Sequence, residues 1–427
     1  MTALKVPFFR PTIGETEIAE VVNCLRSGWL TTGGLTRAFE AEFARYVGAR
    51  HAVAVNSCTA ALHLALEAVG VRRGDLVVVP AMTFAATAEV VRYFDAVPVF
   101  VDCEPRTQCI DVAAAAHTLE RIAAAAPVAG LAPPYGPVRA IIPMHYAGQM
   151  ADVDAIRALA RDHRLAVVED AAHTLPAFTR SSAGAPWRAV GTTGDITCFS
   201  FYANKCITTG EGGMAVTDDA ALADRMRVMS LHGMSKDAWN RYTSAGSWYY
   251  EIVAPGFKYN LTDIAAAIGR AQLARADELW QARRTVAALY REALSTIPGL
   301  ELPLELPDRQ HSWHLYSIRL DLEVFRCGRA AFIEALKQRG VATSVHWLPL
   351  HMQPYYRDTY NLTPDAFPVA HSLWPRLVSL PIFPGMTRDE VATVANAIRD
   401  IHDANADHVG DVGPASPAEL AQAAGTG

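Results

Sequence analysis

The sequence predicts an α/β protein with a large, doubly wound domain and a mostly parallel sheet, followed by a smaller α+β domain. Short, continuously apolar runs rich in Val and Ile recur in the first half of the chain. This pattern is typical of strands that are buried on both faces of a sheet. Helix-like segments fill the gaps between these runs. The alternation ends near residue 265, where a long helical pattern begins.

The expected strands of the large domain are the seven apolar runs. They are His51–Val55, Leu76–Pro80, Pro98–Asp102, Ala140–Met144, Ala166–Asp170, Ile196–Phe201 and Gly213–Thr217. Helical patterns such as Ala60–Val69 and Val153–Asp162 lie between them. Strands that alternate with helices in this way favour a doubly wound, mostly parallel sheet.

The second half of the chain has a different pattern. A helical pattern from Asp263 is followed by the strand-like run LYSIRLDL and by helical patterns at Arg329–Arg339 and Arg388–His402. A chain of 427 residues exceeds the usual size of one core. We therefore expect a large domain over residues 1–265 and a small domain over 266–404. Residues 405–427, which end in GPASPAELAQAAGTG, are expected to form a disordered tail.

Charge and composition exclude several classes of protein. The chain has 38 basic and 44 acidic residues, a net charge of -6 and no block of Lys and Arg, so we expect neither nucleic acid nor a membrane as a partner. It contains no apolar run of the roughly 18 residues that a spanning helix needs. The start lacks the apolar core of a signal peptide. Seven Cys without a CxxC pair are typical of reduced thiols, so we expect a cytoplasmic protein.

Two groups of polar residues lie where expected strands end, the edge at which open α/β sheets bind ligands. The turn Asn56–Ala60 (NSCTA) precedes a helix, and its hydroxyl and amide groups suit a phosphate. Ser or Thr at this point is also typical of an ordinary N-cap. Glu169 and Asp170 end a buried strand. An acid there either caps the next turn or holds a cationic ring nitrogen.

Lys205 follows the strand Ile196–Phe201 and precedes the small residues TTGEGG, which let backbone pass close to a ligand. A desolvated lysine loses its proton and forms a Schiff base with a carbonyl, whereas the alternative is a solvated loop lysine. Ser200 offers a second hydroxyl to an anion site. Phosphate site, acid and lysine are the set that pyridoxal 5′-phosphate (PLP) requires for its phosphate, its ring nitrogen and its aldehyde.

Several longer motifs resemble one family. They are SGWLTTG (27–33), NSCTAALHLAL (56–66), PAMTFAATAEVV (80–91), EDAAH (169–173), CFSFYANKCITTGEGG (198–213) and GFKYNLTDIAAAIG (256–269). In these motifs, from about residue 6 to about residue 403, the chain resembles the fold-type I PLP-dependent sugar aminotransferases of the DegT/DnrJ/StrS group.

The resemblance implies roles for individual residues. Lys205 matches the lysine that forms the Schiff base and moves the proton, and Asp170 matches the acid that pairs with the pyridine nitrogen. His173 matches a residue that contacts the phenolic oxygen, and Phe84 an aromatic residue near the ring. The other implied contacts are the phosphate cup (Cys58, Thr59, Ala60 and Ser200), a phosphate contact from the neighbouring subunit (Asn260) and a substrate contact (Thr31).

The chain departs from the family pattern in two motifs. Many members have Gly where Cys58 stands, so the cup backbone here must avoid a conformation that only Gly adopts. Many members also read YNYR where this chain reads FKYN, with Lys258 and Asn260 in place of Asn and Arg. The KYN version resembles a subgroup that acts on UDP-linked 4-keto sugars. A related dehydratase branch has His in place of the lysine, and Lys205 argues against that branch.

The resemblance implies an aminotransferase that moves an amino group from an amino acid, expected to be glutamate, to a keto sugar, expected to be a nucleotide-linked 4-keto sugar. Transfer to a keto-cyclitol or a 3-keto sugar is an alternative, because such relatives share all the cofactor residues. A PLP-binding regulator without turnover is another alternative, but the chain has no DNA-binding motif or basic stripe and its lysine is intact. A homodimer with shared active sites is also implied.

Two pairs of histidines stand outside these motifs. His311 and His314 in HSWH, and His346 and His351 in HWLPLH, lack the spacing of a metal site, so we expect no metal. We expect His346 and His351 either to line the cleft between the two lobes or to pack within loops, which makes His346 a candidate substrate contact.

Overall fold

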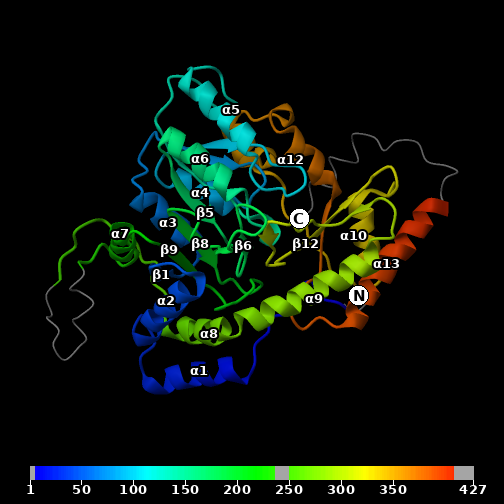
Figure 1. The fold of residues 1–427 in the computed structure, drawn as a ribbon, viewed down its shortest axis with the longest axis horizontal. Coiled ribbons are helices and arrows are strands. Elements are labelled where there is room, and N and C mark those ends of the chain that lie inside the picture. The colour runs from blue at the N-terminus through cyan, green and yellow to red at the C-terminus, as the bar shows by residue number, and fades with distance from the viewer. Residues whose placement is uncertain (1–4, 236–249, 408–427) are drawn as a thin grey trace.

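A seven-stranded sheet forms the centre of the computed structural model, which describes residues 5–235 and 250–407 (Figure 1). The strand order is β1-β9-β8-β5-β4-β2-β3. The strands are β1 (His51–Val55), β2 (Leu76–Pro80), β3 (Val97–Val101), β4 (Val138–Ile141), β5 (Ala166–Asp170), β8 (Ile196–Ser200) and β9 (Gly213–Thr217). Neighbouring strands are parallel except that β9 is antiparallel to β1 and β8. All seven expected strands are present, which confirms the predicted α/β class.

Successive residues of the strands point to opposite faces of the sheet, and both sets are apolar. Helices therefore cover both faces. In β1, Val53 and Val55 join the core cluster that contains helix α3, whereas Ala52 and Ala54 join the cluster that contains α2. Helix α3 packs beside α4 and α7, and α5 packs beside α6. The helices of this part are α1 (Glu15–Ser27), α2 (Gly34–Val47), α3 (Cys58–Ala68), α4 (Ala85–Arg92), α5 (Val112–Ala123), α6 (Val153–His163) and α7 (Ala220–Ser230).

The long helix expected from Asp263 is two helices, α8 (Asp263–Ala274) and α9 (Ala276–Leu294). They meet at Arg275, whose backbone (φ -109°, ψ 7°) leaves the helical region. The Arg275 guanidinium contacts Glu17 of α1 at 3.2 Å and Glu278 of α9 at 2.9 Å. The chain bends at this point, so α8 lies against α1 while α9 continues into the small lobe (Figure 1).

The small lobe has its own apolar core. A three-stranded sheet of order β10-β12-β13 lies among α9, α10 and α13. Val6, near the N-terminus, belongs to this core and bridges Val341. The other β-strands and α-helices are β6 (Phe178–Thr179), β7 (Arg188–Ala189), β10 (Leu300–Glu301), β11 (Arg309–Gln310), β12 (Tyr316–Leu320), β13 (Leu377–Leu380), α10 (Gly328–Gln338), α11 (Pro354–Tyr360), α12 (Pro368–Leu373) and α13 (Arg388–Asp407).

The predicted boundary between residues 265 and 266 falls inside α8, which packs against α1 and α2. The division into residues 1–265 and 266–404 stays a prediction. Helix α13 extends to Asp407, and the rest of the predicted tail, residues 408–427, lies outside the described residues. Within residues 5–235 and 250–407, no helix is both long enough and apolar enough to cross a membrane.

Candidate active site

Lys205 lies in the connection between β8 and β9, beyond the carboxyl end of the parallel strands. Its Nζ atom is 3.4 Å from Nε2 of His314. Burial lowers the pKa of Lys205 to about 8, although Cys58 and Asp170 act in the opposite direction. The residue keeps part of its surface open to solvent, but protein atoms surround its amine and displace most of the water. A substantial fraction of the amine is therefore neutral, and nucleophilic, near pH 8.

Asp170, the last residue of β5, is buried at the same edge of the sheet. Its carboxylate accepts hydrogen bonds from Thr87 Oγ1 at 2.7 Å and from the amide of Ala172 at 3.1 Å. Burial raises its pKa, and these two hydrogen bonds and the nearby Lys205 only partly oppose that shift. A cation placed against this desolvated carboxylate would be stabilised and would favour its charged form.

The neighbouring acid, Glu169, has a different role because successive side chains of a strand point to opposite faces. Its carboxylate accepts hydrogen bonds from Thr193 at 2.7 Å and Thr197 at 2.8 Å, and it lies 3.6 Å from His145 Nε2. Burial would raise its pKa, but these polar contacts outweigh burial and lower it. Glu169 therefore stabilises the fold, and Asp170 is the acid that faces the lysine.

The expected phosphate cup is the N-terminus of α3. Ser57 is its N-cap, and the Ser57 Oγ atom accepts the amide of Ala60 at 3.1 Å. Other amides of the first helical turn lack intrahelical partners and suit an anion. Cys58 begins the helix without a left-handed backbone, as its substitution for Gly requires. The main chain of Gly213 packs against the Ser57–Cys58 peptide, and Ser200 is the partner of Gly213 in the β8–β9 ladder.

An aromatic cluster lies beside the lysine. The buried His173 ring stacks on Trp347 at 5.0 Å between centroids and lies 4.3 Å from the ring of His314. Nδ1 of His173 accepts the amide of Ala147 at 3.3 Å. Burial, reinforced by the charge on Lys205, lowers the pKa of His173 well below its usual value. His173 is therefore neutral with its proton on Nε2, which leaves that nitrogen as a hydrogen-bond donor.

Phe84 and His346 extend this cluster toward solvent. Phe84 precedes α4, is 57% exposed and lies 6.2 Å from the Trp347 ring. The structure thus places an exposed aromatic face at the edge of the site. The ring of His346 lies 5.6 Å from that of Trp347, its Nδ1 pairs with Ser379 Oγ at 2.8 Å and its ring stacks on Phe8. Burial lowers the pKa of His346 to about 4, so this ring is neutral at physiological pH.

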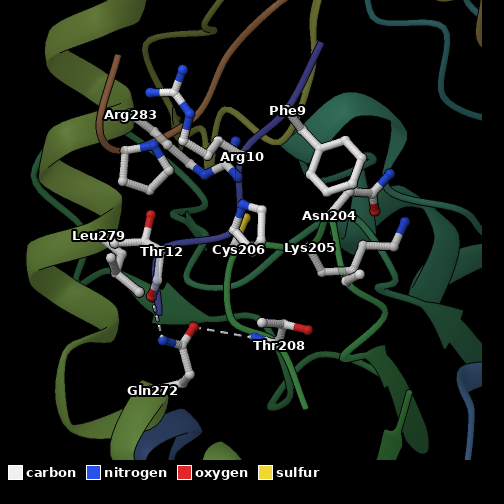
Figure 2. Close-up of a pocket in the computed structure, with 13 residues that line it drawn as sticks. Phe9, Arg10, Thr12, Asn204, Lys205, Cys206, Thr208, Gln272, Leu279 and Arg283 are labelled. Atoms are coloured by element: carbon white, nitrogen blue, oxygen red, sulfur yellow. Dashed lines mark hydrogen bonds between the residues drawn. The ribbon is translucent and has the colours of Figure 1, made fainter. Parts of the chain in front are cut away.

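A pocket behind Lys205 joins the two lobes (Figure 2). Gln272 of α8 donates to the carbonyl of Thr12 at 2.9 Å and accepts the amide of Thr208 at 3.4 Å. It therefore ties the N-terminal segment to the Lys205 loop. Arg283 of α9 is buried and donates to the carbonyls of Trp313, His314 and Ile382. The Oδ1 atom of Asn204, next to Lys205, is buried without a partner among the described residues.

Thr31 and Asn260 do not line the Lys205 pocket, although Asn260 bridges Val55 just before the cup. Thr31 is exposed, and its carbonyl accepts the amide of Asp263. The Asn260 side chain donates to Thr32 Oγ1 at 2.6 Å and accepts a hydrogen bond from Lys258. Asn260 also lines a cavity of about 380 Å³ between α2, β1 and α7. Within one chain the structure therefore does not bring Thr31 to Lys205, and the contact of Asn260 with a phosphate across subunits stays a prediction.

Several residues of the site were not predicted from the sequence. No local pattern in the sequence marks Thr87, Trp347 or Arg283, and His314 stands out only as one of two histidines without the spacing of a metal site. In the described residues no group of three or more His, Cys, Asp or Glu side chains is arranged to hold a metal. Thr87 lies in the first turn of α4, and its hydroxyl contacts that of Thr83, just before the helix, at 2.6 Å.

The residues present fit PLP. The pKa of Lys205 is affected by Cys58 and Asp170, so amine, cup and acid lie close to one another. Gly213 leaves the cup free of a side chain, and the α3 amides suit a phosphate. The desolvated carboxylate of Asp170 lacks only a cation, which a protonated pyridine nitrogen supplies.

Comparisons with known proteins agree with this geometry. The model of the DegT/DnrJ/EryC1/StrS aminotransferase family matches residues 11–399. The spore coat polysaccharide biosynthesis protein SpsC of Bacillus subtilis is 45% identical over 397 residues, which are 93% of this chain and 97% of SpsC. Among solved structures, Spr1654 from Streptococcus pneumoniae in its PMP form has a TM-score of 0.82 and 29% identity, with 94% of this chain and 98% of that chain covered. Helicobacter pylori PseC, an aminotransferase involved in the biosynthesis of pseudoaminic acid, has a TM-score of 0.81 and 26% identity, with 93% and 99% covered.

The chain belongs to the DegT/DnrJ/EryC1/StrS aminotransferase family, and the family and its structural neighbours are PLP-dependent sugar aminotransferases. Spr1654 has been solved in both a PLP and a PMP form. The fold type, the enzyme class and the cofactor expected from the sequence are thereby confirmed.

Proposed function

We propose that this enzyme transfers the amino group of glutamate to the keto group of a nucleotide-linked 4-keto sugar, as a cytoplasmic homodimer. The observation that carries the proposal is the placement of Lys205, with its pKa lowered to about 8, beside the buried carboxylate of Asp170. An amine that loses its proton easily, next to an acid that holds a cationic ring, is what amino-group transfer with PLP needs.

The residues of this chain have separate tasks in the proposed reaction. PLP, when bound, supplies an aldehyde that takes up the amino group and a ring that accepts electrons. The amine of Lys205 would hold the aldehyde and, when free, would carry the proton that leaves the donor's α-carbon. Asp170 keeps the ring nitrogen protonated, and Thr87 and Ala172 fix the orientation of its carboxylate. The neutral His173 donates its Nε2–H to the phenolic oxygen.

Two features hold the cofactor in this arrangement. The amides of Cys58 and Thr59 and the hydroxyls of Thr59 and Ser200 would bind the phosphate at the N-terminus of α3, next to Ala60, whose amide donates to Ser57 Oγ. Phe84 presents its exposed ring to the cofactor ring.

The substrate class is supported by the relatives and by one motif. SpsC is named for polysaccharide biosynthesis and PseC for an aminotransfer reaction in the biosynthesis of pseudoaminic acid. The KYN segment, Lys258 to Asn260, resembles the version found in enzymes that act on UDP-linked 4-keto sugars. Thr31 and His346 are the proposed substrate contacts.

The lysine assignment is tested by comparing Lys205→Ala with Lys337→Ala, in which an exposed lysine of the small lobe is removed. We expect the first variant to bind PLP but to lose turnover, because no other group supplies the amine, and the second to keep the activity of the wild type. Release of 2-oxoglutarate from glutamate and formation of an amino sugar are measured by mass spectrometry. Normal turnover of Lys205→Ala would contradict the assignment.

The acceptor is tested with a panel of nucleotide-linked 4-keto sugars, 3-keto sugars and keto-cyclitols. Preference for a 4-keto sugar supports the proposal, and preference for either of the other classes contradicts this part of it. The absence of turnover with every donor and acceptor would favour a binding protein without catalysis.

The shared active site is tested by mixing subunits. Asn260→Ala and Lys205→Ala are each expected to be impaired as homodimers. In a mixed dimer, one site combines the intact Lys205 of one subunit with the intact Asn260 of the other, so activity returns. A mixed dimer that stays inactive would contradict the contact across subunits.

A further inference from the structure

His314 lies directly against the amine of Lys205. It belongs to the segment between β11 and β12, is 4% exposed, and its Nε2 atom is 3.4 Å from Lys205 Nζ. Nδ1 of the same ring is also buried and has no hydrogen-bond partner in the described part of the chain. Among the described residues, Lys205 is thus the one polar partner that the structure shows for this imidazole.

The backbone around His314 is fixed from two sides. The amide of Leu315 donates to the carbonyl of Ala147 at 3.0 Å. Arg283 of α9 donates to the carbonyls of His314 at 3.4 Å and Trp313 at 3.2 Å. The ring itself packs 4.3 Å from the ring of His173. The backbone that carries the imidazole is therefore held from both lobes, and the ring leaves its contact with His173 if it turns away from the lysine.

The imidazole is neutral, because burial and the charge on Lys205 lower its pKa well below the usual value. A neutral imidazole has one N–H group and one lone pair, on different nitrogens. With its proton on Nδ1, Nε2 accepts a hydrogen bond from the lysine. With its proton on Nε2, the ring donates to the lone pair of the neutral amine. In both tautomers Nε2 has a partner only while Lys205 stays in this position.

We propose that His314 is a positioning residue for Lys205, whose free amine it holds in the site by a hydrogen bond from a rigid, neutral ring. The inference rests on the role of Lys205 in the proposed function. His314 forms no covalent bond and ends with no additional proton. The hydrogen bond holds the amine in one orientation. Less conformational entropy is therefore lost when the amine reaches a carbonyl carbon.

The experiment measures covalent capture of the cofactor by Lys205 separately from its non-covalent binding. Apo-protein is mixed with PLP, and the rate of growth of the visible absorbance band measures capture by Lys205. The affinity for 4′-deoxypyridoxine 5′-phosphate, which has no aldehyde, measures non-covalent binding alone. The variants are His314→Phe, which keeps a flat ring without nitrogen, His314→Gln, which keeps a polar atom, and the control His311→Phe. His311 lies in the same segment, but its Nδ1 pairs with the amide of Trp313 at 2.8 Å.

For His314→Phe we expect capture at least about tenfold slower than in the wild type, with affinity for the aldehyde-free analogue changed by no more than about twofold. His314→Gln recovers part of the rate, and in His311→Phe any change in capture is matched by the change in analogue affinity. Capture by His314→Phe at the rate of the wild type would overturn the proposal. An equal loss of capture and analogue affinity in His314→Phe would also overturn it, because it would show a purely structural role.

Failure of the proposed function gives a different result in the same assay. If Lys205→Ala captures PLP with the band and rate of the wild type, Lys205 does not bind the aldehyde, and the task proposed for His314 disappears with it. If Lys205→Ala shows no capture but His314→Phe is normal, only the inference about His314 is wrong.

Discussion

The replacement Gly213→Ala tests whether the phosphate cup depends on the close approach of β9 to the start of α3. A Cβ atom at residue 213 would lie 2.4 Å from the carbonyl carbon of Ser57, 2.5 Å from its oxygen and 2.6 Å from the nitrogen of Cys58. These are backbone atoms, so no side chain can rotate away to make room. They are also the peptide that begins the cup.

The size of the effect follows from these distances. Ordinary contacts begin near 3.4 Å, so Ser57 and Cys58 must retreat from the new methyl group by about 0.8 to 1.0 Å. Overpacking of this kind costs about 1–3 kcal/mol. If the cup absorbs the displacement, the affinity for PLP falls by about 5-fold to 150-fold. The strain arises from the approach of the backbone, since Gly213 is not among the residues with positive φ.

The assay is a PLP titration followed by visible absorbance, together with thermal unfolding of the apo-protein. Gly34→Ala is the matched control, because a Cβ at this first residue of α2 meets no atom within 4 Å. We expect Gly34→Ala to bind PLP like the wild type. If Gly213→Ala binds PLP with unchanged affinity and its Tm is also unchanged, the account of the cup is refuted.

Two further predictions concern the acid and the amine. Asp170→Asn keeps the fold and binds PLP, but its turnover falls by about 10²–10⁴-fold, because a neutral amide does not hold the ring nitrogen protonated. Single-turnover absorbance with glutamate measures this rate. A rate near that of the wild type would mean that Asp170 is only structural. Capture of PLP by the apo-protein becomes faster as the pH rises through about 8 and then levels off. The reason is that the pKa of Lys205 is lowered from 10.5 and the neutral amine is the reactive form. A rate that still rises steeply at pH 10 would show a lysine with its ordinary pKa.

The large sheet was predictable because its strands are buried on both faces and so read as continuous apolar runs, such as Leu76–Pro80. The direction of β9 was not specified by its apolar pattern, because that pattern is the same for parallel and antiparallel strands. The break between α8 and α9 was also missed. Helical periodicity continues through Arg275, and the bend coincides with contacts to Glu17, which lies far away in the sequence.

Local sequence patterns also predicted some parts of the site, whereas parts that depend on contacts between distant segments were not predicted. Lys205 and Asp170 could be found because each follows an apolar strand, and the ends of neighbouring strands meet at one edge. His314 and Trp347 come from the second half of the chain, more than 100 residues after Lys205, and reach the site only through the packing of the small lobe. No local pattern marks such contacts. Arg283 was missed for a similar reason, since its partners are backbone carbonyls of two distant segments.

The near-ultraviolet and visible absorbance spectrum of the purified, PLP-loaded enzyme, recorded before and after addition of glutamate, tests the central claim most directly. We predict that the band of the cofactor held by Lys205 is replaced by that of pyridoxamine phosphate, and that Lys205→Ala shows neither the band nor its replacement. A wild-type spectrum that glutamate leaves unchanged would contradict glutamate as the donor, and no response to any amino acid would contradict amino-group transfer itself.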